Sequence, residues 1–279
     1  MIDLHSHSTC SDGRLAPAEL VAAAAENGVK TLALTDHDTV EGLARAGSAA
    51  ASHDMAIVSG VEISVTWQRR TLHIIGLAFD PESPALTSGL AGIQASRLER
   101  AERTATKLEK LGIAGALARA SVLAGEGQIG RPHFARLMIE DGYCKNMQQA
   151  FKRYLRPGKP GYAATEWASL TDAIDWIQAA GGIAVLAHPH GYGLSGAWRR
   201  RMVAAFAEAG GDAMEICTGT SKAEHVAVSA RDAREYGLLA SVGSDFHAPE
   251  QHWLSLGGLR PLPGDLTPVW QDTRFRTMA

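Results

Sequence analysis

Cysteine is scarce in this chain, which has only three among 279 residues. Cys10, Cys144 and Cys217 are odd in number and show no pairing pattern, so we expect no disulfide framework. With no export signal beside them, the thiols are predicted to be reduced, as is usual in the cytoplasm. Cys10 lies between two candidate ligands, but we interpret it as structural.

Signals for a membrane are also lacking. No apolar run reaches the roughly 18 residues of a spanning helix, and residues 181–187 form only a strand-length run. The first residues have neither the basic nor the apolar region of a signal peptide. We therefore expect no membrane partner and a cytoplasmic location.

An excess of positive charge is missing as well, because 27 Lys and Arg face 30 Asp and Glu and give a net charge of −3. Nonspecific nucleic-acid binders are normally basic, so this function class is disfavoured. A small nucleotide held by a local basic patch stays compatible with the composition. Internal repeats and low-complexity tracts are absent, and no pattern indicates an obligate protein partner.

Short strand signals alternate with helical ones in two parts of the chain. Strands are expected near residues 2–7, 31–35, 56–65, 71–79, 183–187, 213–217 and 238–242, with helices at 17–27, 40–52, 170–180, 198–209 and 222–236. This alternation is typical of a parallel β/α architecture. We therefore predict an α/β catalytic domain of about seven strands, built from residues 1–83 and 165–279.

The segment between these two parts has no clear strand signal. Residues 84–164 instead contain helical stretches at 86–111, 114–123, 132–141 and 147–155, joined by glycine- or proline-rich connections. We interpret the segment as a helical insertion, in the position of a lid, that contributes substrate contacts.

Six histidines and three carboxylates lie at or just after the ends of the expected strands. They are His5, His7, Asp12, His37, Glu62, His73, His188, Asp245 and His247. Taken singly, each has an ordinary explanation, such as a turn residue for Asp12 or a core histidine for His73. Ligands in parallel α/β folds gather at the carboxyl ends of strands, so the joint pattern predicts a cluster of divalent metals.

The motifs Asp-Leu-His-Ser-His, Thr-Asp-His-Asp, Gly-Val-Glu, Ala-His-Pro and Ser-Asp-Phe-His, in this order, resemble those of the PHP (polymerase and histidinol phosphatase) family. The resemblance covers both sides of the insertion. It implies a distorted seven-stranded β/α barrel, amidohydrolase-like, with three metal ions. Manganese is favoured, and zinc or iron is the alternative.

The resemblance also divides the nine ligands among the three metals. His5, His7, Glu62 and Asp245 would hold the first metal, and Asp12, His37 and His247 would hold the second. Glu62 would bridge to a third metal completed by His73 and His188. A metal-dependent phosphatase is therefore expected, in which a bridging hydroxide attacks phosphorus. We name Asp12, His37 and His190 as catalytic candidates; Asp12, Asp36 or His190 could protonate the leaving group.

Candidate substrate contacts lie mainly in the insertion, and they are Arg131, His133, Phe134, Lys159 and, outside it, His190. Arg131 could clasp a second phosphate bidentately, although a surface arginine is the ordinary explanation. Lys159 lies in a Gly- and Pro-rich loop, where an ordinary lysine is merely solvated. Ser221 and Lys222 are weaker candidates.

Within the PHP family, the inserted Gly-Arg-Pro-His resembles the branch that acts on 3′,5′-bisphosphonucleotides, such as adenosine 3′,5′-bisphosphate. The expected activity is removal of the 3′-phosphate, with the 5′-phosphate gripped by Arg131 and Lys159. Three alternatives stay open: a 5′→3′ exoribonuclease on short RNA, a histidinol-phosphate-type phosphatase, and a noncatalytic metal-binding module of a polymerase.

Overall fold

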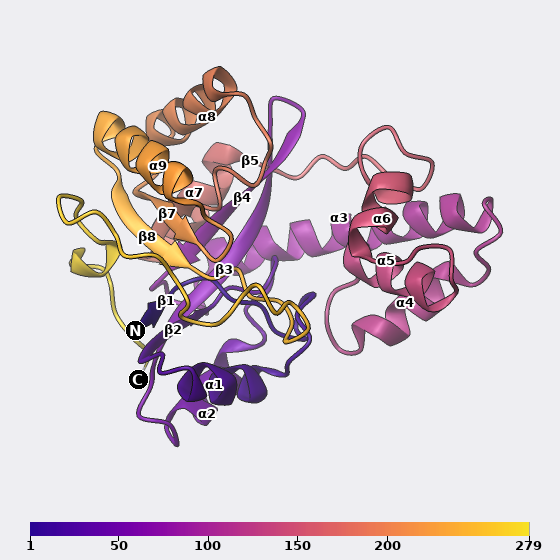
Figure 1. Ribbon diagram of the computed structural model, residues 1–279, viewed down its shortest axis with the longest axis horizontal. Coiled ribbons are helices and arrows are strands. Elements are labelled where there is room, and N and C mark those ends of the chain that lie inside the picture. The colour runs from indigo at the N-terminus through magenta and orange to yellow at the C-terminus, as the bar shows by residue number, and fades with distance from the viewer. Residues whose placement is uncertain (279) are drawn as a thin grey trace.

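The centre of the molecule is a mixed sheet that curls into a nearly closed barrel (Figure 1). The computed structural model describes residues 1–278. The sheet follows the order β1-β2-β3-β4-β6-β7-β8, with β5 paired to β3 beside this path. The strands are β1 (Ile2–Asp3), β2 (Thr31–Leu34), β3 (Ala56–Trp67), β4 (Arg70–Leu77), β5 (Ala168–Ser169), β6 (Ile183–Leu186), β7 (Ala213–Thr218) and β8 (Leu239–Gly243). The path of seven strands confirms the expected distorted β/α barrel.

Helices cover the outside of this barrel, with α1 and α2 on one side and α7, α8 and α9 on another (Figure 1). Their bounds are α1 (Pro17–Glu26), α2 (Leu43–Ala50), α7 (Leu170–Ala179), α8 (Gly196–Glu208) and α9 (Ala223–Tyr236). Each presents an apolar face to the sheet, and the fully buried Leu32, Ile63, Ile174 and Phe206 belong to the resulting core. Burial of this apolar surface is the main force that holds helices to strands.

The barrel closes where the chain continues beyond β1. The backbone N–H of Leu4 donates to Val242 O at 3.0 Å, and that of His7 donates to Phe246 O at 2.9 Å. A separate buried cluster, which includes Leu4, Val58, Ile75 and Val185, fills the interior. The C-terminal segment contributes Val269, within the short 3₁₀ helix η2 (Val269–Gln271), to the same cluster.

The parallel arrangement typical of a β/α architecture is interrupted at β4, which runs antiparallel to both β3 and β6. Strands β3 and β4 form a long hairpin whose two turn residues, Gln68 and Arg69, have φ of 48° and 61°. Positive φ at both positions is the requirement of a type I′ hairpin turn, which normally selects Asn or Gly. Neither residue type occupies the turn, so the hairpin has no local signal in the sequence.

Residues 84–164 contain helices and, within the described chain, no strand. The helices are α3 (Pro84–Glu109), α4 (Ala116–Ala124), α5 (Arg131–Glu140), α6 (Met147–Ala150) and the π-helical turn η1 (Phe151–Leu155). Helix α3 extends from the barrel to the group formed by α4, α5 and α6 (Figure 1). This group has its own hydrophobic core, which includes Leu108, Phe134, Leu137 and Met138.

Among the described residues, no helix combines the length and apolar character needed to cross a membrane. The three cysteines are buried and free.

We predict a structural role for Phe134, whose side chain is 1% exposed in the core of the inserted helices. Replacement of a buried phenylalanine by alanine costs about 3–5 kcal/mol, so Phe134→Ala should destabilise α3, α4 and α5 relative to the barrel. Hydrogen exchange of the full chain, resolved by segment, measures this difference. Met147→Ala, at an exposed site, is the control. Equal protection in the two variants would contradict the assignment.

Candidate metal centre

Loops after β1, β2, β6 and β8 converge at one end of the barrel and carry seven of the nine predicted ligands. Glu62 and His73 lie within β3 and β4, inside the strands that the sequence predicts at residues 56–65 and 71–79. The hairpin continues past the end of β2, where His37 forms an isolated parallel bridge with Glu62. Glu62 therefore lies at the same end of the barrel as the ligands on the loops.

The Glu62 carboxylate is the meeting point of the cluster and is 1% exposed. Its Oε2 lies 3.4 Å from His5 Nε2, 3.3 Å from His7 Nε2 and 3.0 Å from His37 Nδ1. Its Oε1 lies 2.9 Å from His73 Nδ1 and 2.8 Å from His188 Nε2. Each carboxylate oxygen thus faces a different set of imidazoles, the arrangement that a bridging ligand requires.

Two further carboxylates complete the cluster. Asp245 Oδ1 lies 3.4 Å from His5 Nε2 and 3.3 Å from His7 Nε2. Asp12 Oδ1 lies 3.4 Å from His247 Nε2, and Asp12 Oδ2 lies 4.0 Å from His37 Nε2. All nine predicted residues therefore contribute to one contiguous centre.

The donor atoms fall into overlapping groups that could each hold a cation: His5, His7 and Asp245; His5, Glu62 and His188; His37, Glu62 and His73; and His7, Asp12, His37 and His247. Within the described residues, His7 Nδ1, Asp12 Oδ1 and His37 Nδ1 are buried and form no hydrogen bond, although His247 and Glu62 lie at ion-pair distance from the last two. Buried polar atoms are normally satisfied, so these atoms fit a site that receives a ligand. Imidazole and carboxylate together suit manganese, iron or zinc.

The electrostatics of the cluster fit a cation as well. Burial would raise the pKa of Glu62, but His37, His73 and His5 hold it well below its usual range. Burial lowers the pKa of His37 well below its usual range, even though Glu62 and Asp12 oppose that effect. Glu62 is therefore ionised, the state in which a carboxylate binds a metal.

Glu215, in the centre of β7, is absent from the predicted ligand set, yet it holds two of the ligands. Its Oε1 lies 3.0 Å from His5 Nδ1, and its Oε2 accepts the backbone N–H of His188 at 2.5 Å. A carboxylate on the second nitrogen of a ligand histidine fixes the orientation of the ring. A sequence signal exists, because Glu215 interrupts the apolar strand Ala-Met-Glu-Ile-Cys just as Glu62 interrupts its own.

Asp36 and Asp38 position loops around the centre. Asp36 accepts hydrogen bonds from Ser8 N at 2.7 Å and from the hydroxyls of Ser8 and Ser11, each at 2.6 Å. These bonds shape the loop that carries Asp12 and occupy both oxygens of Asp36. Asp38 accepts from Ser64 N at 2.6 Å and from Arg97 Nε at 2.5 Å. Arg97 lies on α3, so this ion pair ties the inserted helices to the metal-binding loops.

A cavity of about 200 Å³ opens beside the cluster, between the barrel and the inserted helices. It is lined by Asp12, His37, Ser64, Thr71, His73, Arg97, Arg100, Gly130, Arg131, Pro132 and Phe151. Of the predicted substrate contacts, Arg131 lies in this cavity. Sequence reasoning missed Arg97 and Arg100, because charged residues at helical spacing are usually a solvated face.

The other predicted contacts lie elsewhere. His133 is buried, and its Nδ1 accepts the Gly130 N–H at 2.9 Å, so it caps α5 next to Arg131. Phe134 belongs to the core of the inserted helices, and Lys159 is exposed and does not line the cavity.

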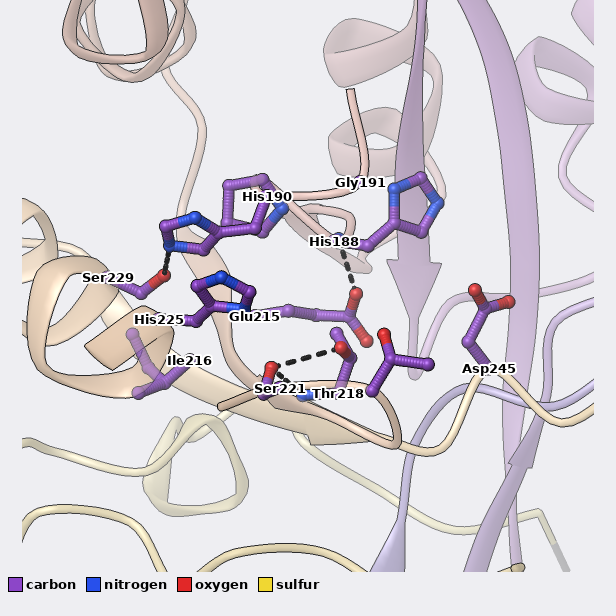
Figure 2. A pocket seen from close by; sticks show the side chains of 12 residues that line it. His188, His190, Gly191, Glu215, Ile216, Thr218, Ser221, His225, Ser229 and Asp245 are labelled. Atoms are coloured by element: carbon purple, nitrogen blue, oxygen red, sulfur yellow. Dashed lines mark hydrogen bonds between the residues drawn. The ribbon is translucent and has the colours of Figure 1, made fainter. Parts of the chain in front are cut away.

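His190, a candidate both for catalysis and for substrate contact, lies apart from Asp12. It turns toward Ser229 and His225, away from the ring of His188 (Figure 2). It lines a second cavity, which contains neither Asp12 nor any of the three arginines. Sequence spacing places His190 near the centre but does not determine the direction of a side chain in a loop.

The barrel and its cluster of imidazoles and carboxylates define the class of the protein, an enzyme of the metal-dependent phosphoesterase type. The model of the PHP domain family matches residues 3–180, and the chain belongs to this family. The resemblance inferred from the motifs is thereby confirmed.

Known proteins similar to this chain have related activities. The chain is 44% identical over 278 residues to a 3′,5′-nucleoside bisphosphate phosphatase of Chromobacterium violaceum, covering 99% of this chain and 98% of that protein. It is 44% identical over 269 residues to a 5′-3′ exoribonuclease of Haemophilus influenzae, covering 96% and 97% of the two chains. A solved amidohydrolase from Chromobacterium violaceum aligns with a TM-score of 0.92 at 44% identity, over 96% of this chain and 94% of that one.

We predict that Glu62 is needed for metal binding. Glu62→Gln replaces the shared carboxylate by a neutral amide, a weaker ligand, and should lose most of the metal that the wild-type protein retains after loading and dialysis. Elemental analysis measures bound metal per chain, and circular dichroism confirms folding. Glu82→Gln, at an exposed position, is the control. Full metal content in Glu62→Gln would refute the bridging role.

Glu215→Gln should weaken metal affinity by about 10- to 100-fold, the usual effect of removing a partner that orients a ligand histidine. The amide oxygen can still accept a hydrogen bond from one neighbour. The amide NH₂ group, which is a donor, then faces the other donor, either His5 Nδ1–H or the backbone N–H of His188. Competition with a metal chelator measures the affinity, with exposed Glu208→Gln as the control. Unchanged affinity would show that His5 and His188 are held without Glu215.

Proposed function

We propose that this protein hydrolyses the 3′-phosphate of 3′,5′-bisphosphonucleotides, such as adenosine 3′,5′-bisphosphate, to give the nucleoside 5′-monophosphate and phosphate. The observation that carries the proposal is the cavity in which Arg97, Arg100 and Arg131 face the ligand cluster. A substrate with two phosphates could reach both groups at once.

The arginines of this cavity carry positive charge that the protein does not fully balance. Arg97 is paired with Asp38. Within the described residues, neither Arg100 nor Arg131 forms a salt bridge; they lie over the rings of Trp167 and Phe151, at 4.6 Å and 5.7 Å from the ring centroids. Burial and the neighbouring Arg97 lower the pKa of both guanidiniums. Buried cations that repel one another favour an anionic ligand, and guanidinium matches phosphate geometry.

The nine ligands would hold three divalent ions, with Glu62 shared between two of them, and manganese is the ion to use in tests. When bound, such ions acidify water and neutralise charge on a phosphoryl group. Asp12 faces the cavity from beside the cluster. Asp36 is fully engaged with Ser8 and Ser11, and His190 lies in another cavity. Burial would raise the pKa of Asp12, but His247 and His37 hold it well below its usual range, so its carboxylate is ionised. Asp12 would therefore take a proton from the attacking water and pass it to the leaving 3′ oxygen.

The cavity disfavours the histidinol-phosphate alternative. Histidinol phosphate carries one phosphate and an ammonium group, so its cation would face Arg100 and Arg131. Like charges in a desolvated site are costly. A 5′-phosphate, in contrast, supplies the missing negative charge. The noncatalytic module is not supported by a cluster in which every ligand position is filled.

We predict that Arg131→Ala lowers kcat/KM for adenosine 3′,5′-bisphosphate by about 10- to 150-fold, the value of a charge-assisted hydrogen bond of about 1.5–3 kcal/mol. Phosphate release from adenosine 3′-monophosphate, which lacks the second anion, should be unaffected. Steady-state assays of the manganese-loaded enzyme measure both. Arg119→Ala, which breaks an exposed pair with Asp141 in the same helical group, is the control. An equal loss on both substrates would contradict the division of roles.

A further inference from the structure

The second cavity, of about 270 Å³, borders the metal centre at a different place (Figure 2). Two of the nine ligands, His188 and Asp245, form one end of it, and neither of them lines the arginine cavity. The remainder lies between the loop after β6, strand β7 and the start of α9. The two cavities therefore share no lining residue and meet only through the ligand cluster.

The walls of this cavity suit a nucleoside rather than a phosphate. His190 and His225 form a stacked pair, with ring centroids 4.4 Å apart and an interplanar angle of 12°. The hydroxyls of Thr218 and Ser221, which hydrogen-bond to each other at 3.0 Å, also line the cavity. Of the described residues that line the cavity, none is lysine or arginine. Flat side chains stack on bases, and hydroxyls bind sugar or base edges.

We propose that this cavity binds the nucleoside attached to the far side of the scissile phosphate in a short RNA carrying a 5′-phosphate. The inference rests on the proposed function, which puts the 5′-phosphate at Arg100 and Arg131 and the 3′-phosphate at the metals. In RNA the same 3′-phosphate bears a second nucleoside, which needs space that begins at the cluster and leads away from the arginines. The second cavity begins at His188 and Asp245 and meets that requirement.

The size of the cavity sets the length of the segment it holds. Pockets for small molecules usually measure about 300–1,000 Å³, so 270 Å³ accommodates one nucleoside and no longer segment. Further residues of the RNA would lie outside. The net charge of −3 agrees with this limit, because no extended basic track is required.

The reaction is the same for both substrates. The oxygen of water bonds to phosphorus, the bond between phosphorus and the 3′ oxygen breaks, and a proton passes to that oxygen. With a bisphosphonucleotide, the second product is inorganic phosphate. With RNA, it is the shortened chain, whose new 5′ end carries the phosphate. Each cleavage therefore regenerates the 5′-phosphate that the arginine cavity recognises.

The test compares two substrates of the manganese-loaded full chain, adenosine 3′,5′-bisphosphate and the 5′-phosphorylated dinucleotide pApA. His225→Ala removes one ring of the stacked pair, whereas His225→Phe keeps a flat surface. The loss of stacking on one base corresponds to a decrease in affinity of about 5- to 150-fold. His225→Ala should lose that factor in kcat/KM on the dinucleotide, chiefly through KM, and keep wild-type activity on the bisphosphate. His225→Phe and the exposed control His53→Ala should resemble wild type on both substrates.

The outcomes separate this inference from the proposed function. If the wild-type enzyme hydrolyses the bisphosphate but not pApA, the inference is wrong and the proposed function stands. If His225→Ala affects neither substrate, or both equally, the second cavity is not the nucleoside site. If the wild-type enzyme hydrolyses neither substrate, the proposed function fails and the inference fails with it.

Discussion

The buried carboxylate of Glu62 is the constraint on which the rest of the site depends. Five imidazoles surround it, at 2.8 to 3.4 Å from its oxygens. A carboxylate without such partners would be very costly to bury at this position. The hairpin of β3 and β4, the closure of the barrel at β1 and β8, and the loop after β6 each bring at least one of these imidazoles to the same point.

Two further carboxylates, Glu215 and Asp38, hold residues around the centre in position by hydrogen bonds. Glu215 joins His5 to the backbone of His188, and Asp38 joins the strand residue Ser64 to Arg97 of α3. Because one of these contacts crosses to the inserted helices, the arginine cavity and the metal ligands belong to one hydrogen-bonded unit. The positions of the arginines in this cavity therefore depend on the same contacts as the positions of the ligands.

The sequence predicts the residues whose positions follow from strand topology, but not those whose positions depend on tertiary packing. His5, His37 and His247 lie just beyond strands, and the topology alone brings strand ends together. Glu62 and His73 are recognisable as ligands, but their hairpin is not, because Gln68 and Arg69 adopt positive φ without the residues that usually signal it. Arg100 lies on a helix whose charged positions resemble a solvent-exposed face, and only the packing of α3 against the barrel end shows otherwise. The directions of His190 and Phe134 depend on tertiary contacts that local sequence does not contain.

The two cavities differ in the substrate groups they can distinguish. The first offers guanidinium groups in a desolvated space. Under the proposed function, a substrate lacking the 5′-phosphate would leave these charges unpaired, a penalty that discriminates strongly. The second offers flat rings and hydroxyls, whose contacts are weaker and tolerate many partners. Under the proposed function, such an enzyme would select the 5′ end of its substrate and be permissive toward the group on the far side of the scissile phosphate. A single phosphate and a nucleotide chain would then be alternative occupants of the same reaction centre.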